Sequence, residues 1–441
     1  MPDKTSPIAI PAGDARPIKV VYLAAGAAGM YCGSCMRDNR LAATLIAQGR
    51  DITLMPLYTP LRTDETDVST PRVHYGGINV FLQQSSSLFQ HTPWWLDRLL
   101  DARTLLTGVA RFAGSTRPET LGALTVSVLR GQDGRQRKEL DKLIAALRPL
   151  RPDVINLANL MFVGLARRLK NALGTAVVCT LSGEDIFLDR LTEPFRTRAF
   201  ELIRRDASDI DAFIAVTNYS AEHAARHFHL PHNRVHTIRM GIRAVDFPSA
   251  APPERPFTIG YLARICPDKG LAPLCEAVAR LRQQGRDCRL RIAGYLGPAD
   301  RPYLDEVLAR NRRRGIDRII THVGEVTRNQ KMDFLRGCHA LSVPAVFPEA
   351  KGFYILEALA AGVPVVQPRS GAFPELINAT GGGLLYDPDG PQPLADALSR
   401  LMDDPPLRKR LADQGRAAVR ASFTNREMAE RTWTLYRQLL Q

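Results

Sequence analysis

At 441 residues the chain is longer than one ordinary hydrophobic core supports, and it predicts two domains of roughly 200 residues each. Its 45% hydrophobic and 24% charged residues are typical of a globular protein, and no apolar run approaches the roughly 20 residues that span a bilayer. The net charge of +14 favours phosphate-bearing or acidic partners, but the basic residues are scattered without a recognisable nucleic-acid module, so we expect no nucleic acid as a partner.

The beginning of the chain and its cysteines indicate the compartment. Residues 1–16 lack the apolar centre of a signal peptide, so we expect a flexible tail on a cytoplasmic protein. Seven cysteines, an odd number, then indicate reduced thiols. Cys32 and Cys35 form a C-x-x-C pair ahead of a predicted helix, where a redox-active thiol would lie. One such pair cannot supply the four ligands of a structural zinc site, and we expect no metal.

Strand-like apolar runs alternate with amphipathic, helix-length stretches along nearly the whole chain, which is typical of parallel sheets wrapped by helices. A strand over 18–25, a glycine-rich turn, a helix over 36–48 and a strand over 51–57 form a first β-α-β unit. The stretch 60–135 is less regular. Further strands are predicted at 153–157, 176–181, 212–217 and 235–240.

A proline-rich segment over 248–256 forbids both helix and central strand, so we place the domain boundary there. The second half repeats the alternation, with strands at 258–262, 289–293, 321–324, 340–344 and 363–367 and helices near 270–284, 301–314, 328–336 and 353–361. The predicted fold class is α/β, with two Rossmann-like, doubly wound domains over 17–247 and 257–423 and a final helix over 424–441. Since ligands bind outside the carboxyl ends of such strands, we expect the active site in the cleft between the domains.

Two glutamates in the second half are the most informative residues. Glu349 and Glu357 flank the Gly352-Phe353 step, which opens an Ala- and Leu-rich helix. A helix start offers unpaired N–H groups and a partial positive charge, which suit a phosphate. Carboxylates beside it are expected to accept hydrogen bonds from hydroxyl groups instead. The pattern predicts a site for a ligand that carries phosphate and sugar hydroxyls, although the pair standing alone would indicate only a solvated helix end.

Two turns after predicted strands are candidate phosphate sites. Arg264 and Lys269 follow the strand at 258–262, where two cations suit a diphosphate, unless they form only a solvated basic turn. The glycine-rich turn over 26–33 lacks the order G-x-G-x-x-G, which disfavours NAD. We expect this turn, through Gly29, to contact a phosphate or a second substrate, with a plain tight turn as the alternative.

Two further clusters are ambiguous. Glu375 lies at the start of a predicted helix and is either part of the site or a helix cap. Ser182, Glu184 and Asp185 follow a buried strand of the first domain. The two acids would orient the hydroxyl of a second substrate, or they are surface-loop charges.

Together these motifs resemble those of the family 4 retaining glycosyltransferases. The matching features are the Arg264 and Lys269 pair, Gly294 after a strand, the Glu349-x7-Glu357 motif with the run that follows it to 366, and Gly371 to Glu375. The resemblance covers about 257–425, and the first half is similar mainly through its first β-α-β unit. It implies the GT-B fold, two Rossmann-like domains around a cleft, with the last helix crossing back onto the first domain.

The resemblance implies a metal-independent, retaining enzyme without a cofactor. Such an enzyme moves a hexose from a UDP-, GDP- or ADP-sugar to a hydroxyl of a glycan, lipid or small molecule. The catalytic residues would be Arg264 and Lys269, on the donor diphosphate, and Glu349, on the hydroxyls of the donor sugar. Glu357 would hold the ribose. The remaining donor-binding residues are expected to be Gly29, Gly294, Gly352, Phe353 and Glu375.

The chain departs from the family at two places. Ser182 stands where the family often has His, so no histidine base is assigned on the acceptor side. Met240 lies in an Arg-Met-Gly sequence where the family typically has Pro-Asn-Gly. The first departure fits a front-face displacement in which the departing phosphate takes the acceptor proton.

Other readings of the sequence stay open. A GT-B nucleotide-sugar epimerase needs no acceptor, and a glycan phosphorylase needs a pyridoxal-lysine context that the sequence does not show. Cys32 and Cys35 would instead define a thiol-disulfide protein. Trp94 and Trp95 begin an amphipathic segment that suits peripheral contact at the inner face of a membrane, or equally a core helix.

Overall fold

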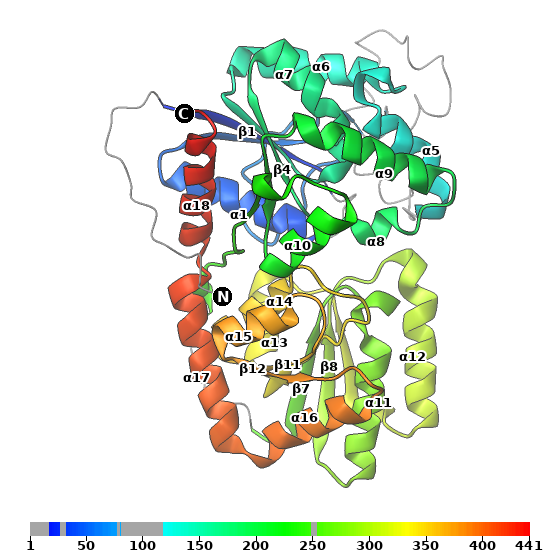
Figure 1. The fold of residues 1–441 in the computed structure, drawn as a ribbon. Helices are drawn as coiled ribbons and strands as arrows, with labels where there is room; N and C mark the ends of the chain where they lie inside the picture. The colour runs from blue at the N-terminus through cyan, green and yellow to red at the C-terminus, as the bar shows by residue number, and fades with distance from the viewer. Residues whose placement is uncertain (1–16, 27–31, 77–79, 81–117, 248–253) are drawn as a thin grey trace.

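The computed structural model describes residues 17–26, 32–76, 80, 118–247 and 254–441. Within these residues it contains two six-stranded sheets in which all paired strands are parallel. Figure 1 shows them as two lobes, one above the other, with helices around each sheet. The predicted α/β class with two doubly wound domains is confirmed. The tail over 1–16, the linker residues 248–253 and the Trp94-Trp95 segment lie outside the described residues.

The first sheet has the strand order β2-β1-β3-β4-β5-β6, so its order reverses between β1 and β3. Its strands are β1 (Lys19–Ala24), β2 (Asp51–Pro56), β3 (Val154–Leu157), β4 (Ala176–Thr180), β5 (Ala212–Ala215) and β6 (Val235–Thr237). Its helices are α1 (Gly33–Ala47), α5 (Pro118–Leu129), α6 (Arg137–Leu147), α7 (Ala166–Leu173), α8 (Asp185–Leu188), α9 (Phe195–Asp206) and α10 (Asn218–His227). Each predicted strand of the first half is present, with ends that differ by a few residues.

The second sheet has the order β12-β11-β10-β7-β8-β9 and reverses between β10 and β7. Its strands are β7 (Phe257–Leu262), β8 (Cys288–Ala293), β9 (Ile320–Gly324), β10 (Ala340–Leu341), β11 (Val365–Pro368) and β12 (Gly383–Tyr386). Its helices are α11 (Leu271–Gln283), α12 (Arg301–Arg313), α13 (Arg328–Arg336), α14 (Phe353–Ala360), α15 (Phe373–Thr380), α16 (Gln392–Asp403) and α17 (Pro405–Ser422). The sequence did not predict β12, because it begins at the end of a run of three glycines, which disfavour strands.

Strand β1 explains why the first lobe needs the end of the chain. Its residues from Val20 to Ala24 are all buried, as expected for a parallel strand covered on both faces. Val21 and Leu23 pack into one core, whereas Tyr22 and its alternate neighbours pack on the opposite face. Helix α18 (Asn425–Gln438) lies beside α1 on that opposite face (Figure 1). The core of the first lobe is therefore completed by the last helix.

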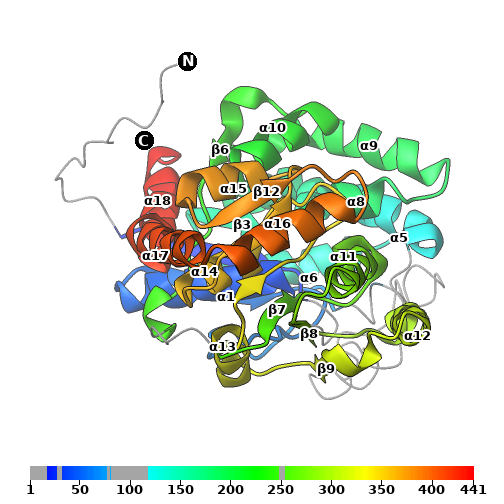
Figure 2. The ribbon, with the colours of Figure 1, turned by 90° about the horizontal axis from the view of Figure 1, so that it is seen from below.

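The chain returns to the first lobe next to the segment by which it left. Ile242 forms an isolated parallel bridge with Thr424, in which the Ile242 amide donates to the Phe423 carbonyl at 2.9 Å. Seen from below, α17 and α18 lie together along one edge of the molecule, on the side away from α12 (Figure 2). No helix among the described residues combines the length and the apolar character needed to cross a membrane.

Candidate active site

A cavity of about 260 Å³ lies between the two domains. Its second-domain wall comes from the segments after β7, β8 and β9 and from the start of α14, and its first-domain wall includes Gly33, Met36 and Asp64. These segments follow the carboxyl ends of parallel strands, where ligands bind in such sheets. The predicted residues that the structure brings together here are Arg264, Lys269, Gly294, Glu349, Gly352, Phe353 and Glu357.

Gly294 allows the ends of β7 and β8 to approach each other. Its φ of 148° is a backbone conformation that residues other than glycine rarely adopt. A Cβ atom at this position would also lie 1.8 Å from the carbonyl oxygen of Ala263. Ala263 precedes Arg264, whose side chain is exposed at the cavity and whose carbonyl accepts a hydrogen bond from the Tyr261 hydroxyl at 3.2 Å. The glycine is thus required for the shape of the turn that carries Arg264.

Glu349 and Lys269 form an ion pair inside the cavity. The side chains are 7% and 19% exposed, and the Lys269 ammonium also lies 4.9 Å from the centre of the Phe347 ring. Burial disfavours the charged carboxylate, but the neighbouring ammonium outweighs it and holds the pKa of Glu349 below its ordinary value. Glu349 is therefore ionised and can only accept hydrogen bonds.

The backbone of Glu349 is held by the loop before α15. The Ala372 amide donates to the Glu349 carbonyl at 2.8 Å. A Cβ atom on Gly371 would lie 2.5 Å from that same carbonyl oxygen, so only glycine permits the contact. The predicted Gly371 to Glu375 motif therefore positions Glu349 through its glycine.

Glu357 belongs to a buried chain of charges that joins the domains. The Lys331 ammonium donates to Glu357 Oε1 at 2.6 Å and to Asp64 Oδ2 at 2.5 Å. Burial disfavours the Lys331 ammonium, yet the two carboxylates raise its pKa above the ordinary value. Lys331 comes from α13 and Asp64 from the loop after β2, and neither residue belongs to a motif that indicated a functional role.

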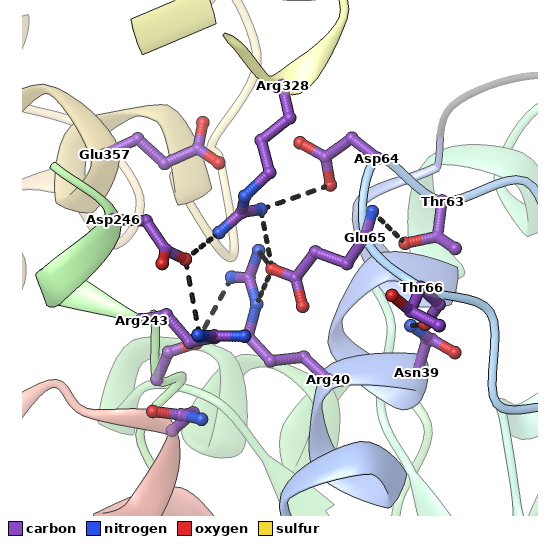
Figure 3. A network of polar contacts seen from close by, with 12 residues as sticks. Asn39, Arg40, Thr63, Asp64, Glu65, Thr66, Arg243, Asp246, Arg328 and Glu357 are labelled. Carbon is purple, nitrogen blue, oxygen red and sulfur yellow. Dashed lines mark hydrogen bonds and ion pairs between the residues drawn. The ribbon is translucent and has the colours of Figure 1, made fainter.

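A second group of charged side chains lies beside Asp64 and Glu357 (Figure 3). Arg328 pairs with Glu65 at 2.8 Å and with Asp246, while Arg40 of α1 also pairs with Glu65, at 2.6 Å. Arg243 lies 3.4 Å from Asp246. In Figure 3 the Arg328 guanidinium points between Asp246 and Glu65. The network fixes the loop after β2 against both α13 and the segment that leaves the first domain.

Lys351 is a further cation of the site, and its sequence position alone did not indicate a role in binding. It lies between the two motif glutamates, lines the cavity, and donates to the Ser34 hydroxyl of α1 at 2.6 Å. Burial lowers the pKa of Lys351. Cys32, the residue before α1, is a free thiol whose pKa is lowered by a hydrogen bond from Cys35 and by the nearby Lys351. The start of α1 and the start of α14 are thus joined across the cavity.

Glu375 does not line the cavity. Its two carboxylate oxygens accept hydrogen bonds from the backbone amides of Asn218 and Tyr219, each at 3.0 Å. It therefore caps the N-terminus of α10, in the other domain, where a negative charge is favoured by the helix dipole. Gly29 lies outside the described residues.

The predicted acceptor-side residues lie beside the cavity and not in its wall. The buried Glu184 carboxylate accepts from the Ser182 amide at 2.9 Å and from the Leu160 amide at 3.1 Å. Asp185 lies 3.1 Å from His223 of α10. Glu184 and Asp185 line a small hollow together with Ala350, the neighbour of Glu349. The geometry gives Glu184 a structural role in its loop and leaves Asp185 at the domain interface.

Two sequence families match this chain. The model of the glycosyl transferases group 1 matches residues 243–418, and that of glycosyltransferase family 4 matches residues 112–244. An alpha-D-kanosaminyltransferase from Streptomyces kanamyceticus is 29% identical over 57% of this chain and 66% of its own. An alpha-maltose-1-phosphate synthase from Mycobacterium tuberculosis is 32% identical over 47% of this chain and 57% of its own length. These matches span less than two thirds of either relative.

Solved structures share the whole fold. Sucrose-phosphate synthase from Thermosynechococcus elongatus superposes with a TM-score of 0.70 at 16% identity, over 96% of this chain and 99% of its own. The Anabaena protein HepE, in complex with UDP-glucose, gives a TM-score of 0.65 at 15% identity, over 96% and 100%. The two family models confirm the resemblance to family 4 glycosyltransferases that was inferred from the motifs, one in each half of the molecule, and the chain has the GT-B fold.

Proposed function

We propose that this protein transfers a hexose from a nucleoside diphosphate sugar to a hydroxyl group of an acceptor, with retention of the anomeric configuration and without a metal ion. One observation carries the proposal: the cavity combines the cations Arg264 and Lys269 and the start of α14 with the buried carboxylates of Glu349 and Glu357. Cations and helix N–H groups suit a diphosphate, and ionised carboxylates suit sugar hydroxyls. HepE, solved with UDP-glucose, supports a donor of this class.

Each residue has a defined task in this proposal. Arg264 and Lys269 bind the diphosphate and stabilise the charge that develops as it leaves. Glu349 orients the donor sugar through its hydroxyls, and Glu357 holds the ribose. The amides of Gly352 and Phe353 meet the sugar and the phosphate.

The acceptor attacks from the side on which the diphosphate departs, and the departing phosphate oxygen takes the proton of the acceptor hydroxyl. This route needs no protein nucleophile, which accords with Ser182 where the family often has histidine. The acceptor is a glycan, a lipid or a small molecule. A cytoplasmic location, with peripheral contact at the inner membrane face, belongs to the same proposal.

Donor binding tests the proposal directly. We expect one of UDP-glucose, GDP-mannose, ADP-glucose or a related donor to raise the unfolding temperature, since a ligand at a hundred times its Kd adds about 2.7 kcal/mol of stability. Glu349→Gln and Lys269→Ala should each lower kcat/KM by about a hundredfold or more, because each removes charge-assisted contacts in the transition state. Glu306→Gln, on the exposed face of α12, is the control.

The product distinguishes the remaining alternatives. A transferase requires an acceptor, retains the anomeric configuration in the product by NMR, and works in the presence of EDTA. Donor conversion without any acceptor would instead identify an epimerase. Normal transfer by a Cys32→Ser, Cys35→Ser double variant would dispose of thiol-disulfide chemistry, and the absence of any donor binding would overturn the proposed function.

A further inference from the structure

Asp64 is a buried carboxylate, and one of its two oxygens lacks a hydrogen-bond partner among the described residues. Its side chain is 5% exposed, and it lines the cavity from the first domain. Oδ2 accepts the hydrogen bond from Lys331 at 2.5 Å. Oδ1 is buried and has no hydrogen-bond partner in the described parts of the chain; Arg328 Nη1 lies 3.9 Å from it, beyond hydrogen-bond distance. A buried oxygen without a partner is costly, which points to a group supplied from outside the chain.

The chemistry of that group is restricted. Burial disfavours the charged form of Asp64, but Lys331 and the nearby arginines hold its pKa below the ordinary value. The ionised carboxylate only accepts hydrogen bonds, so its partner must donate an O–H or N–H. A phosphate oxygen would be repelled. Asp64 is therefore unsuited to the diphosphate and suited to a hydroxyl.

The position of Asp64 relative to Glu357 identifies the hydroxyl. Glu357 Oε1 and Asp64 Oδ2 both bind the same Lys331 nitrogen, at 2.6 and 2.5 Å, so the two carboxylates are immediate neighbours. They come from different domains and line the same cavity. Two adjacent acceptors match two adjacent donors, and the ribose of a nucleotide presents such a pair in its 2′- and 3′-hydroxyls.

We propose that Asp64 is a donor-binding residue of the first domain, and that Asp64 and Glu357 hold the two ribose hydroxyls as a clamp with one carboxylate from each domain. This inference rests on the proposed function, because Glu357 takes the ribose only if the ligand is a nucleotide. Lys331 is a positioning residue that fixes both carboxylates. Glu65, through Arg328 and Arg40, holds the loop that carries Asp64.

Calorimetry with nucleoside diphosphates tests the clamp. UDP, GDP and ADP are titrated first, and the tightest ligand is then compared with its 2′-deoxy and 3′-deoxy forms. In the unaltered protein we expect each deoxy form to bind at least about tenfold more weakly, since each loses a hydrogen bond to a charged group. In Asp64→Ala, binding of the parent nucleotide should weaken by a similar factor, and the discrimination against one of the two deoxy forms should disappear.

Two further variants keep the test decisive. Asp64→Asn preserves the side-chain size but is a weaker, neutral acceptor, so its discrimination should fall to a few-fold even if the alanine variant folds poorly. Glu65→Gln removes a charge from the same loop at a residue that does not line the cavity. It should weaken the binding of the parent nucleotide and of both deoxy forms by one common factor. Unchanged discrimination in folded Asp64→Ala and Asp64→Asn would overturn the clamp alone, whereas failure of every nucleotide to bind the unaltered protein would overturn the proposed function and the clamp with it.

Discussion

The charge state of Glu349 depends chiefly on its ion-pair partner Lys269, with Lys351 as a second nearby cation. The pKa of Glu349 is below its ordinary value of 4.5 in the folded protein, although burial acts in the opposite direction. A carboxylate of this kind contributes stability above its unfolded pKa, and the contribution is lost as the pH falls through the lower folded pKa. Without the Lys269 ammonium, burial would be opposed mainly by Lys351, so we expect the pKa of Glu349 to rise.

We therefore expect Lys269→Ala to move the acidic limb of the kcat/KM profile to higher pH, since more of the buried Glu349 is protonated at a given pH. The same variant should lose about 3 kcal/mol of stability at pH 7, because it leaves a buried charge without a partner. The pH–rate profile and urea unfolding measure the two effects. Lys409→Ala, whose side chain is 79% exposed, is the matched control, and an unmoved acidic limb would contradict the assigned partnership.

At the scale of elements, the site depends on the close approach between the carboxyl ends of β7 and β8. Gly294→Ala would place a Cβ atom 1.8 Å from the Ala263 carbonyl, so the turn that carries Arg264 must shift. We expect a fall in the unfolding temperature and at least a tenfold loss of donor affinity, because a small displacement of a binding residue is costly. Thermal unfolding and calorimetry measure both.

Gly285→Ala provides the comparison for this prediction. Gly285 has a φ of 75°, but a Cβ atom there would meet nothing within 4 Å. This change should cost only about 1 kcal/mol of backbone strain and leave donor affinity as it is. Equal effects of the two substitutions on donor affinity would show that the contact with Ala263 does not shape the site.

At the scale of the whole molecule, the end of the chain stabilises its beginning. Trp433 of α18 is 6% exposed in the core that contains Tyr22, and the Tyr436 hydroxyl donates to Asn156 of β3 at 3.0 Å. We expect Trp433→Ala to destabilise the protein by about 3–5 kcal/mol, as large-to-small changes in a core do. The loss should appear in the first domain, as faster hydrogen exchange of β1.

Arg426→Ala on the same helix separates core packing from helix propensity. The Arg426 side chain is 80% exposed, and its ion-pair partner among the described residues is Glu430 of the same helix, so its removal should leave the free energy of unfolding nearly unchanged. If Trp433→Ala were no more destabilising than this control, α18 would not be part of the first domain's core.

The sequence alone located most of the second-domain wall of the cavity. Arg264, Gly294, Glu349 and Gly352 each belong to a strand–turn–helix unit, in which a few consecutive residues decide the local structure and which residues face the cleft. Periodicity over short windows therefore predicted the two parallel sheets and the turns that face the cleft. The short strand β12 was not predicted, because the glycines at its start give no strand pattern.

The tertiary structure alone decided which distant residues complete the site. Asp64 lies 267 positions from Lys331, in a stretch with no regular pattern, and Glu375 caps a helix of the other domain 157 positions earlier. Such pairs depend on how the domains pack, and local periodicity carries no information about that packing. The sequence by itself determined the fold and the chemical kind of the site. The packing of one domain against the other determined the first-domain wall of the cavity, because a buried charge at a domain interface pairs with a residue that only this packing places beside it.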